Sequence, residues 1–234
     1  MRRVQVIASV AFKLFFEALS DECRSQREIS LAPVFLPSVP ALKVLLSGDD
    51  CDVLIVSEAA VPRFTDAKLL DVSTIAPLAR SLIGVAIRKG APRPPLRTVD
   101  DFLAIVESAR SIAYTDPKIG TTSGVQFADI LKKFGLEQAV RAKAVLGDGG
   151  PVSHFVGSGL ADVAIQQLSE LVQDEGVEIV GALPEPIQKE TAFVVARAAG
   201  SKNPEAASAF IDLILEPASQ NLLVKFGLQP HRAP

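Results

Sequence analysis

Apolar residues along the chain follow two periods, one typical of buried strands and one typical of amphipathic helices. In the first part of the sequence, short apolar runs at 3–8, 29–36 and 52–56 predict strands. The segments 11–26 and 39–48 repeat apolar residues every three or four positions, which predicts helices. A strand–helix–strand–helix–strand order favours a parallel sheet with right-handed crossover connections.

The alternation continues toward the C-terminus. Further strands are predicted at 80–88, 112–114, 142–146, 162–166, 177–180 and 190–198. Further helices are predicted at 99–108, 151–158, 168–172, 204–215 and 217–226, and another is predicted to start at 121–123 and to end at Gly135. The long apolar strands at 80–88 and 190–198 join two strand–helix blocks. We therefore expect an α/β fold with two lobes, residues 1–80 with 192–234 and residues 81–191, and a ligand cleft between the lobes.

The stretch 111–136 carries the clearest functional signal. An apolar strand is followed by a glycine-containing loop and then by a helix that Gly135 ends. Thr121, Thr122 and Ser123 therefore stand at a helix N-terminus, where backbone N–H groups lack partners and the helix dipole is positive. Such a turn binds anions readily. Serine and threonine are also ordinary N-caps, so the pattern leaves both interpretations open.

Small polar side chains stand at several other predicted strand ends. They are Ser9, Ser38, Ser57, Ser81 and Gln167. Each one alone is a weakly specific signal, and for Ser9 and Ser38 the interpretation as a helix cap is at least as good. Their recurrence after a strand and before a helix favours an anion or polyol held by neutral donors. Arg80 precedes a strongly apolar strand, where it is either a bidentate carboxylate ligand or a surface arginine.

Composition narrows the class of protein. The 234 residues are 48% hydrophobic and 22% charged with a net charge of -3, which is typical of a globular protein and does not favour nucleic acid as a partner. No apolar run reaches the roughly 18 residues of a membrane span. Cys23 and Cys51 lack other ligands at metal-binding spacing, so we expect no metal and no cofactor.

The N-terminus is not predicted to be a signal peptide. Arg2 and Arg3 precede an apolar stretch, but Lys13 and Glu17 interrupt it and no small-residue cleavage site follows. As written, the sequence predicts a cytoplasmic protein, and a periplasmic one if a leader was removed.

The whole chain resembles the type 2 periplasmic solute-binding proteins, specifically the molybdate-binding branch of ABC transport systems. The segments that carry the resemblance are 8–9, 51–57, 78–88, 116–124, 159–165, 200–207, 216–220 and 225–228. The resemblance implies a two-lobed α/β fold in which each lobe is a mixed, mostly parallel sheet flanked by helices. It also implies a small anionic ligand in the cleft and, if the protein is exported, an ABC permease as partner.

The resemblance assigns oxyanion contacts to Ser9, to Ser38 and to the loop 121–123. The family's tyrosine position is Gln167 here, and 36–40 replaces a serine–glycine turn. The segments 166–170 and 80–85 are similar to a divergent branch that includes aconitate isomerase, which implies an organic carboxylate in place of molybdate or tungstate.

Three functions follow as hypotheses. The leading one is a binding protein for a small carboxylate, with Arg80 pairing with the charge. The first alternative is a cofactor-free cytoplasmic isomerase that shifts a double bond in a di- or tricarboxylate by proton transfer, with His154 or Glu58 as the base. The second alternative is a cytoplasmic ligand sensor.

Overall fold

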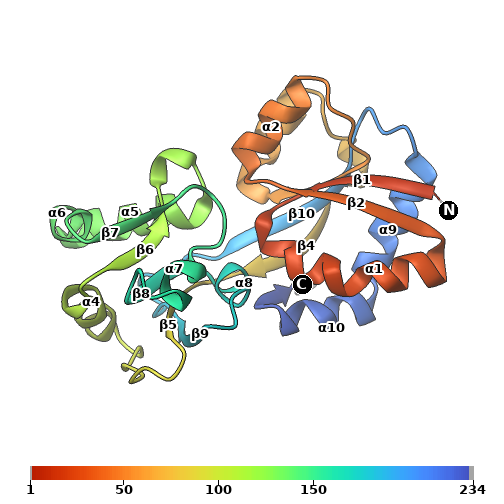
Figure 1. The fold of residues 1–234 in the computed structure, drawn as a ribbon. Coiled ribbons are helices and arrows are strands. Elements are labelled where there is room, and N and C mark those ends of the chain that lie inside the picture. Colours follow the sequence, from red (N-terminus) through yellow and green to blue (C-terminus); the bar gives the residue numbers. More distant parts are fainter. Residues whose placement is uncertain (1, 232–234) are drawn as a thin grey trace. The chain divides into compact units, whose positions relative to one another are not determined.

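The computed structural model describes residues 2–231, which form two compact units (Figure 1). The first unit contains the chain through Arg80 and again from Thr191 onward, and the second is Ser81–Glu190. The second unit is therefore an insertion in the sequence of the first. Each unit has its own sheet with helices on both faces, which confirms the predicted α/β class.

The sheet of the first unit has the strand order β11-β4-β10-β3-β1-β2. Its strands are β1 (Arg2–Ala8), β2 (Ile29–Phe35), β3 (Val53–Ser57), β4 (Ala76–Ser81), β10 (Thr191–Arg197) and β11 (Leu228–Pro230). β1 pairs in parallel with β2 and β3, and β10 runs antiparallel to β3. The parallel part follows from the strand–helix alternation, because helical crossovers return the chain in the same direction.

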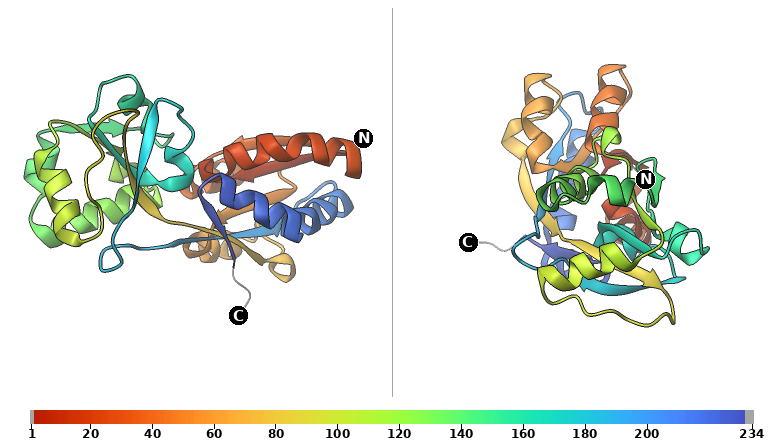
Figure 2. Two further views of the ribbon diagram at one scale, coloured as in Figure 1. Left: turned by 90° about the horizontal axis from the view of Figure 1, so that it is seen from below. Right: turned by 90° about the vertical axis from the view of Figure 1, so that its left-hand side faces the viewer.

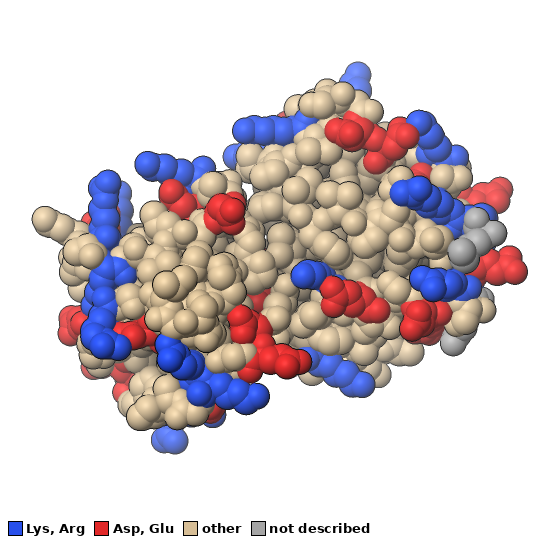
Figure 3. All heavy atoms as spheres, viewed as in Figure 1, with Lys and Arg blue, Asp and Glu red and all other residues tan. Residues whose placement is uncertain are grey.

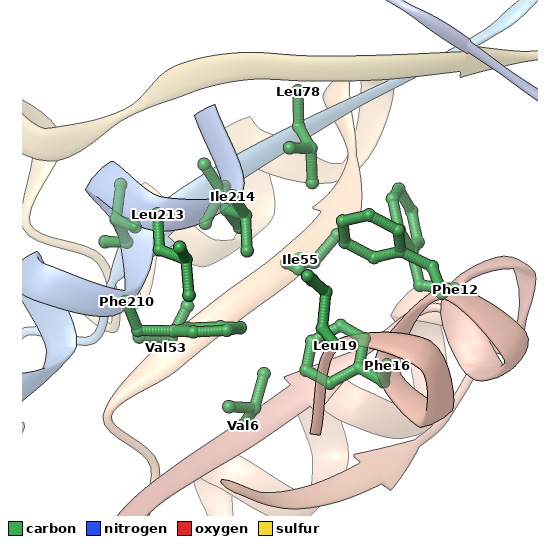
Figure 4. Packing of buried hydrophobic residues seen from close by; sticks show 14 of the residues in the cluster. Val6, Phe12, Phe16, Leu19, Val53, Ile55, Leu78, Phe210, Leu213 and Ile214 are labelled. Atoms are coloured by element: carbon green, nitrogen blue, oxygen red, sulfur yellow. The ribbon is translucent and has the colours of Figure 1, made fainter. Parts of the chain in front are cut away.

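Helices cover both faces of this sheet because successive strand residues point to opposite sides. Val6, Val53 and Ile55 pack with Phe16 and Phe210 on one face (Figure 4). That face is covered by α1 (Lys13–Arg27), α9 (Pro204–Leu215) and α10 (Pro217–Lys225), with α1 and α10 side by side in Figure 2. The alternate residues, such as Leu54 and Val56, pack against α2 (Ser38–Leu46) and α3 (Val61–Asp66). Three short 3-10 helices complete the unit: η1 (Val10–Phe12), η2 (Glu58–Ala60) and η3 (Val72–Thr74).

The sheet of the second unit has the order β7-β6-β8-β5-β9. Its strands are β5 (Ile83–Arg88), β6 (Ile112–Thr115), β7 (Ala144–Gly147), β8 (Val163–Gln167) and β9 (Val177–Ala182). β6 is parallel to β7 and β8, while β5 is antiparallel to β8 and β9. Its helices are α4 (Val99–Ser108), η4 (Pro117–Ile119), α5 (Thr122–Phe134), α6 (Glu137–Arg141), α7 (Ser153–Gly157) and α8 (Leu168–Leu171).

The single long strand expected at 80–88 is wrong. β4 ends at Ser81 in the first sheet, and β5 begins at Ile83 in the second. Both strands are mostly buried, so the apolar pattern is the same in either sheet and does not mark the change of sheet at Leu82. Arg80 therefore lies near the end of β4, not at the start of a strand.

Charged side chains of both signs are interspersed on the face shown in Figure 3, in keeping with the net charge of -3. No broad field of one sign covers that face. Among residues 2–231, no helix is both long and apolar enough to cross a bilayer.

Candidate anion-binding site

The N-terminus of α5 is held close to the end of β6. Thr121 is the N-cap, and its Oγ1 accepts a hydrogen bond from the Gly124 amide at 3.3 Å. A Cβ at Gly124 would lie only 2.6 Å from the carbonyl oxygen of Thr115 on β6. Glycine therefore allows the first turn of α5 to start directly against the strand end.

Ser123 lies in this first turn, and its hydroxyl is unused. The residue is only 2% exposed, and its Oγ has no hydrogen-bond partner among the described residues. A buried polar group without a partner costs free energy, so its presence at a helix N-terminus calls for an explanation. The capping interpretation thus holds for Thr121, while Ser123 remains open to a ligand.

Two neighbouring glutamines at the end of β8 have different surroundings. Gln166 is fully engaged: its Nε2 donates to Thr115 Oγ1 at 3.2 Å and to the Gly150 carbonyl at 3.0 Å, and its Oε1 accepts from the Val152 amide at 2.8 Å. Gln167 is 4% exposed, and its Oε1 has no partner among the described residues. Because β6 and β8 are parallel neighbours, their carboxyl ends lie at the same edge of the sheet.

Ser81 and the α8 segment contribute a buried polar cluster to the second unit. The hydroxyls of Ser81 and Ser169 lie 3.1 Å apart. The next residue, Glu170, is 7% exposed and forms no hydrogen bond with a described residue. Burial raises its pKa from 4.5 to about 8, so the carboxyl is largely protonated at neutral pH. The sequence pattern did not point to Glu170, because a single glutamate in a four-residue helix is normally solvated.

The first unit gathers its predicted serines at one sheet edge. Ser9 follows β1, Ser38 begins α2 after β2, and Ser57 ends β3, and these three strands are parallel neighbours. Ser38 Oγ lies 3.3 Å from Ser57 Oγ and accepts from the Ser57 amide at 3.4 Å. Ser9 Oγ accepts from the Ala11 amide at 3.4 Å. The predicted serines are thus brought together here, but mainly as partners of one another and of the backbone.

A buried carboxylate of the first unit, Asp52, differs sharply from Glu170. It is 2% exposed, and its oxygens accept hydrogen bonds from the Gln5 amide at 2.9 Å, Ser201 Oγ at 2.7 Å and the Asn203 amide at 3.1 Å. Burial raises the pKa of Asp52, but these hydrogen bonds outweigh it, and the pKa lies below its usual value. Asp52 is therefore a charged structural group.

The two predicted bases lie on exposed short helices. His154 is in α7, and its Nδ1 is 2.7 Å from the Pro151 carbonyl oxygen, while its ring lies 3.9 Å from that of Phe155. Glu58 begins η2 and is exposed. Within residues 2–231, no hydrogen bond joins either residue to the strand-end donors.

No metal set is found in the described part of the chain, where no three His, Cys, Asp or Glu side chains form a group. Burial raises the pKa of Cys23 to about 11 and that of Cys51 to about 12, so both remain thiols. The site's chemistry is therefore that of neutral hydroxyl and amide groups with a helix N-terminus, a combination that binds anions.

Comparison with known proteins agrees with this description. A family model described as bacterial extracellular solute-binding protein matches residues 4–229. Among solved structures, the fold is similar to the periplasmic molybdate-binding protein of Azotobacter vinelandii, with a TM-score of 0.81, 17% identity and 99% of each chain covered. It is also similar to a sulfate-binding protein of Mycobacterium tuberculosis, with a TM-score of 0.77, 18% identity, and 99% of this chain and 88% of that chain covered.

A relative with higher sequence identity is an enzyme. An aconitate isomerase from a Pseudomonas species is 32% identical over 187 residues, which are 80% of this chain and 70% of that protein.

Proposed function

Because the chain belongs to the bacterial extracellular solute-binding proteins, we propose that it binds a small organic carboxylate through the strand-end donors of both units. In this proposal Ser9, Ser38 and Ser57 serve the ligand from the first unit, with Arg80 supplying positive charge. The donors of the second unit are Ser81, Thr121, Thr122, Ser123 and Gln167.

The observation that carries the proposal is the unused hydroxyl of Ser123 at the N-terminus of α5. A carboxylate there accepts from the hydroxyl and from the free backbone N–H groups of the first turn, and it meets the positive end of the helix dipole. Binding then satisfies a buried group that the protein alone leaves without a partner.

Two arguments favour a carboxylate over an inorganic oxyanion. The resemblance to the molybdate-binding branch implies that Gln167 stands where that branch has a tyrosine and that 36–40 stands where it has a serine–glycine turn. In addition, the aconitate isomerase relative acts on a tricarboxylate by its name and covers most of this chain. The similarity to molybdate- and sulfate-binding structures, at 17–18% identity, supports the fold alone.

A thermal-shift screen tests the ligand class. Citrate, trans-aconitate, malate, molybdate, tungstate and sulfate are each added to the whole protein. A ligand at 100 times its Kd adds about 2.7 kcal/mol to the stability of the folded state. We expect a concentration-dependent rise in Tm with one or more of the organic acids. A rise with molybdate and none with any carboxylate would overturn the carboxylate class while leaving anion binding intact.

A second candidate function is isomerisation of a tricarboxylate. It is favoured by the aconitate isomerase relative and by Glu170, a buried carboxyl that is protonated near neutral pH and therefore able to donate and accept a proton. Moving a double bond in such an acid requires removal of a proton from one carbon and delivery of a proton to another. Glu170 is a stronger candidate for this step than the exposed His154 or Glu58.

Incubation with cis- and trans-aconitate in deuterated water tests this function. Proton NMR follows the ratio of isomers and the loss of carbon-bound protons. An isomerase interconverts the two acids, and Glu170→Gln slows the reaction by at least about 100-fold. If a carboxylate binds but neither isomer formation nor deuterium uptake occurs, the protein is a binding protein and not an isomerase.

A further inference from the structure

A pocket lies wholly within the second unit, beside η4, the turn that joins β6 to α5. Its volume is about 370 Å³, and its walls come from β6, η4, α5, α6 and β7. Small-molecule sites begin at about 300 Å³, so the pocket is large enough for a compact ligand. Neither Ser123 nor Gln167 lines it, which separates it from the candidate anion-binding site.

Tyr114 presents a fixed polar group to this pocket. The residue is 7% exposed, and its ring packs edge-on against Phe127 with 4.9 Å between ring centroids. Its hydroxyl forms no hydrogen bond with any described residue. Burial and the nearby Asp116 carboxylate raise the pKa of Tyr114, while the Arg141 guanidinium opposes them, so both charges act on this hydroxyl. The pocket therefore holds an unused donor and acceptor between a negative and a positive group.

Four charged side chains line the pocket, two of each sign: Asp116, Lys118, Glu137 and Arg141. None of the four forms an ion pair with a described residue. Asp116 uses one carboxylate oxygen to accept from the Lys118 amide at 3.0 Å, which leaves the other oxygen available. The pocket thus has no net charge, yet it offers separate positive and negative partners.

Apolar side chains complete the lining. Leu131 of α5 is buried, and Leu146 of β7 is 48% exposed although it is a large hydrophobic residue. Covering an exposed leucine with an apolar group releases ordered water and favours binding. A ligand that matches the pocket therefore carries both charges and an aliphatic portion.

We propose that this pocket binds a zwitterionic amino acid with an apolar side chain. Arg141 and the Tyr114 hydroxyl receive the carboxylate, Asp116 and Glu137 receive the ammonium group, and the side chain covers Leu146. A simple carboxylate would pair with the cations but leave Asp116 and Glu137 without a partner, and a simple amine would pair with these carboxylates but leave Lys118 and Arg141 without one. Charge complementarity therefore selects a zwitterion.

Intrinsic fluorescence provides a direct test, because Tyr114 is the only tyrosine and the chain has no tryptophan. The whole protein is titrated with L-leucine, with 4-methylpentanoate, which lacks the ammonium group, and with 3-methylbutylamine, which lacks the carboxylate. We expect a saturable change in tyrosine emission with leucine and at least about tenfold weaker binding of both analogues, equivalent to 1.4 kcal/mol. No saturable response to leucine up to about 10 mM, or equal affinity for an analogue, would overturn the proposal.

Variants locate the response. Arg141→Gln should weaken leucine binding by at least about tenfold, because it removes the carboxylate partner from an exposed helix position. Lys132→Gln, which changes an exposed residue of α5 outside the pocket, should have no effect. Tyr114→Phe, followed by calorimetry, should weaken leucine binding without loss of stability.

Ser123→Ala should leave leucine affinity unchanged, so this test is independent of the carboxylate proposal. Unchanged affinity in Arg141→Gln would contradict the assigned site.

Discussion

The two units place polar side chains at the ends of their parallel strands but use them differently. In the first unit Ser38 and Ser57 bond to each other, and Ser9 caps η1. In the second unit the hydroxyl of Ser123 and the carbonyl of Gln167 are buried without a partner among the described residues. The strand-end serines of the first unit are therefore partnered within the protein, whereas Ser123 and Gln167 of the second unit each keep an open polar group.

The buried acids follow the same division. Asp52 in the first unit accepts three hydrogen bonds and stays charged, while Glu170 in the second unit accepts none from a described residue and stays neutral. A satisfied buried group stabilises the fold, whereas an unsatisfied one weakens it. The comparison therefore separates residues that maintain the structure from residues that are available for a ligand or a proton.

Asp52→Asn is expected to give the largest effect. The substitution replaces a carboxylate oxygen that accepts the Gln5 amide with an amide group that either donates or accepts weakly, and it removes the negative charge. The free energy of unfolding should therefore fall by about 3 kcal/mol at pH 7. Because the folded-state pKa of Asp52 is low, its stabilising effect is present above the unfolded pKa and is lost as the pH falls. Chemical denaturation at pH 7 and at pH 3 measures the loss of stability in the variant and its dependence on pH.

Asp50→Asn is the control, because among the described residues the partner of Asp50 is an exposed lysine. A loss of stability in Asp52→Asn no greater than that in Asp50→Asn would show that the Asp52 network is not structural.

Glu170→Gln should act in the opposite direction. The folded-state pKa is raised, so folding takes up a proton, and the stability of the wild-type protein falls as the pH rises from about 5 through 8. Glutamine removes this dependence, and the variant should be more stable by on the order of 2 kcal/mol at pH 7, with little difference at pH 4. Tm measured from pH 4 to pH 8 tests the trend. A variant that is less stable at every pH would contradict a neutral, unpaired Glu170.

Ser123→Ala should weaken carboxylate binding by about tenfold, which corresponds to one hydrogen bond to a charged group, without lowering stability. Ser219→Ala is a closely matched control. Ser219 is also 2% exposed, also has an unpartnered Oγ and also lies in the first turn of a helix, but that helix is α10. Calorimetry with the acid found in the thermal-shift screen should separate the two variants. Equal effects would mean that the unpartnered hydroxyl of Ser123 has no role in binding.

Ser38→Ala should have the smallest effect, a loss of about 1 kcal/mol in the free energy of unfolding, because it breaks the contacts with Ser57. Urea denaturation measures the loss. Adding Ser57→Ala should cost little more, since the two hydroxyls are partners and their effects are not additive. Fully additive losses would show that the two serines stabilise the fold independently and are not each other's partners.

Local sequence signals predicted much of the fold and part of the site. The Thr121 cap, the αL glycine at Gly135 and the apolar periods of α5 depend on neighbouring residues, so the sequence shows them directly. The hydroxyls of Ser38 and Ser57, which follow predicted strands, lie close to each other in the structure. Strand ends in a parallel sheet share an edge, and this geometry follows once the strand–helix alternation is recognised.

Contacts between distant segments were beyond local patterns. Gln166 and Gln167 are adjacent and chemically identical, yet of these two residues it is Gln166 that bonds to the Gly150 carbonyl and the Val152 amide. The sheet change at Leu82 was missed because a buried strand has the same apolar composition in either sheet. The short α6 and β11 were also not predicted.

The order of strands in the first sheet also has a consequence for synthesis on the ribosome. β10 and β11 lie beside β3 and β4 in that sheet, but about half of the chain separates them in sequence. The inserted segment 81–190, by contrast, emerges as one continuous stretch with all five strands of its sheet. The second unit can therefore fold while the polypeptide is still being made, whereas the first cannot complete its sheet until β10 and β11 have emerged from the ribosome.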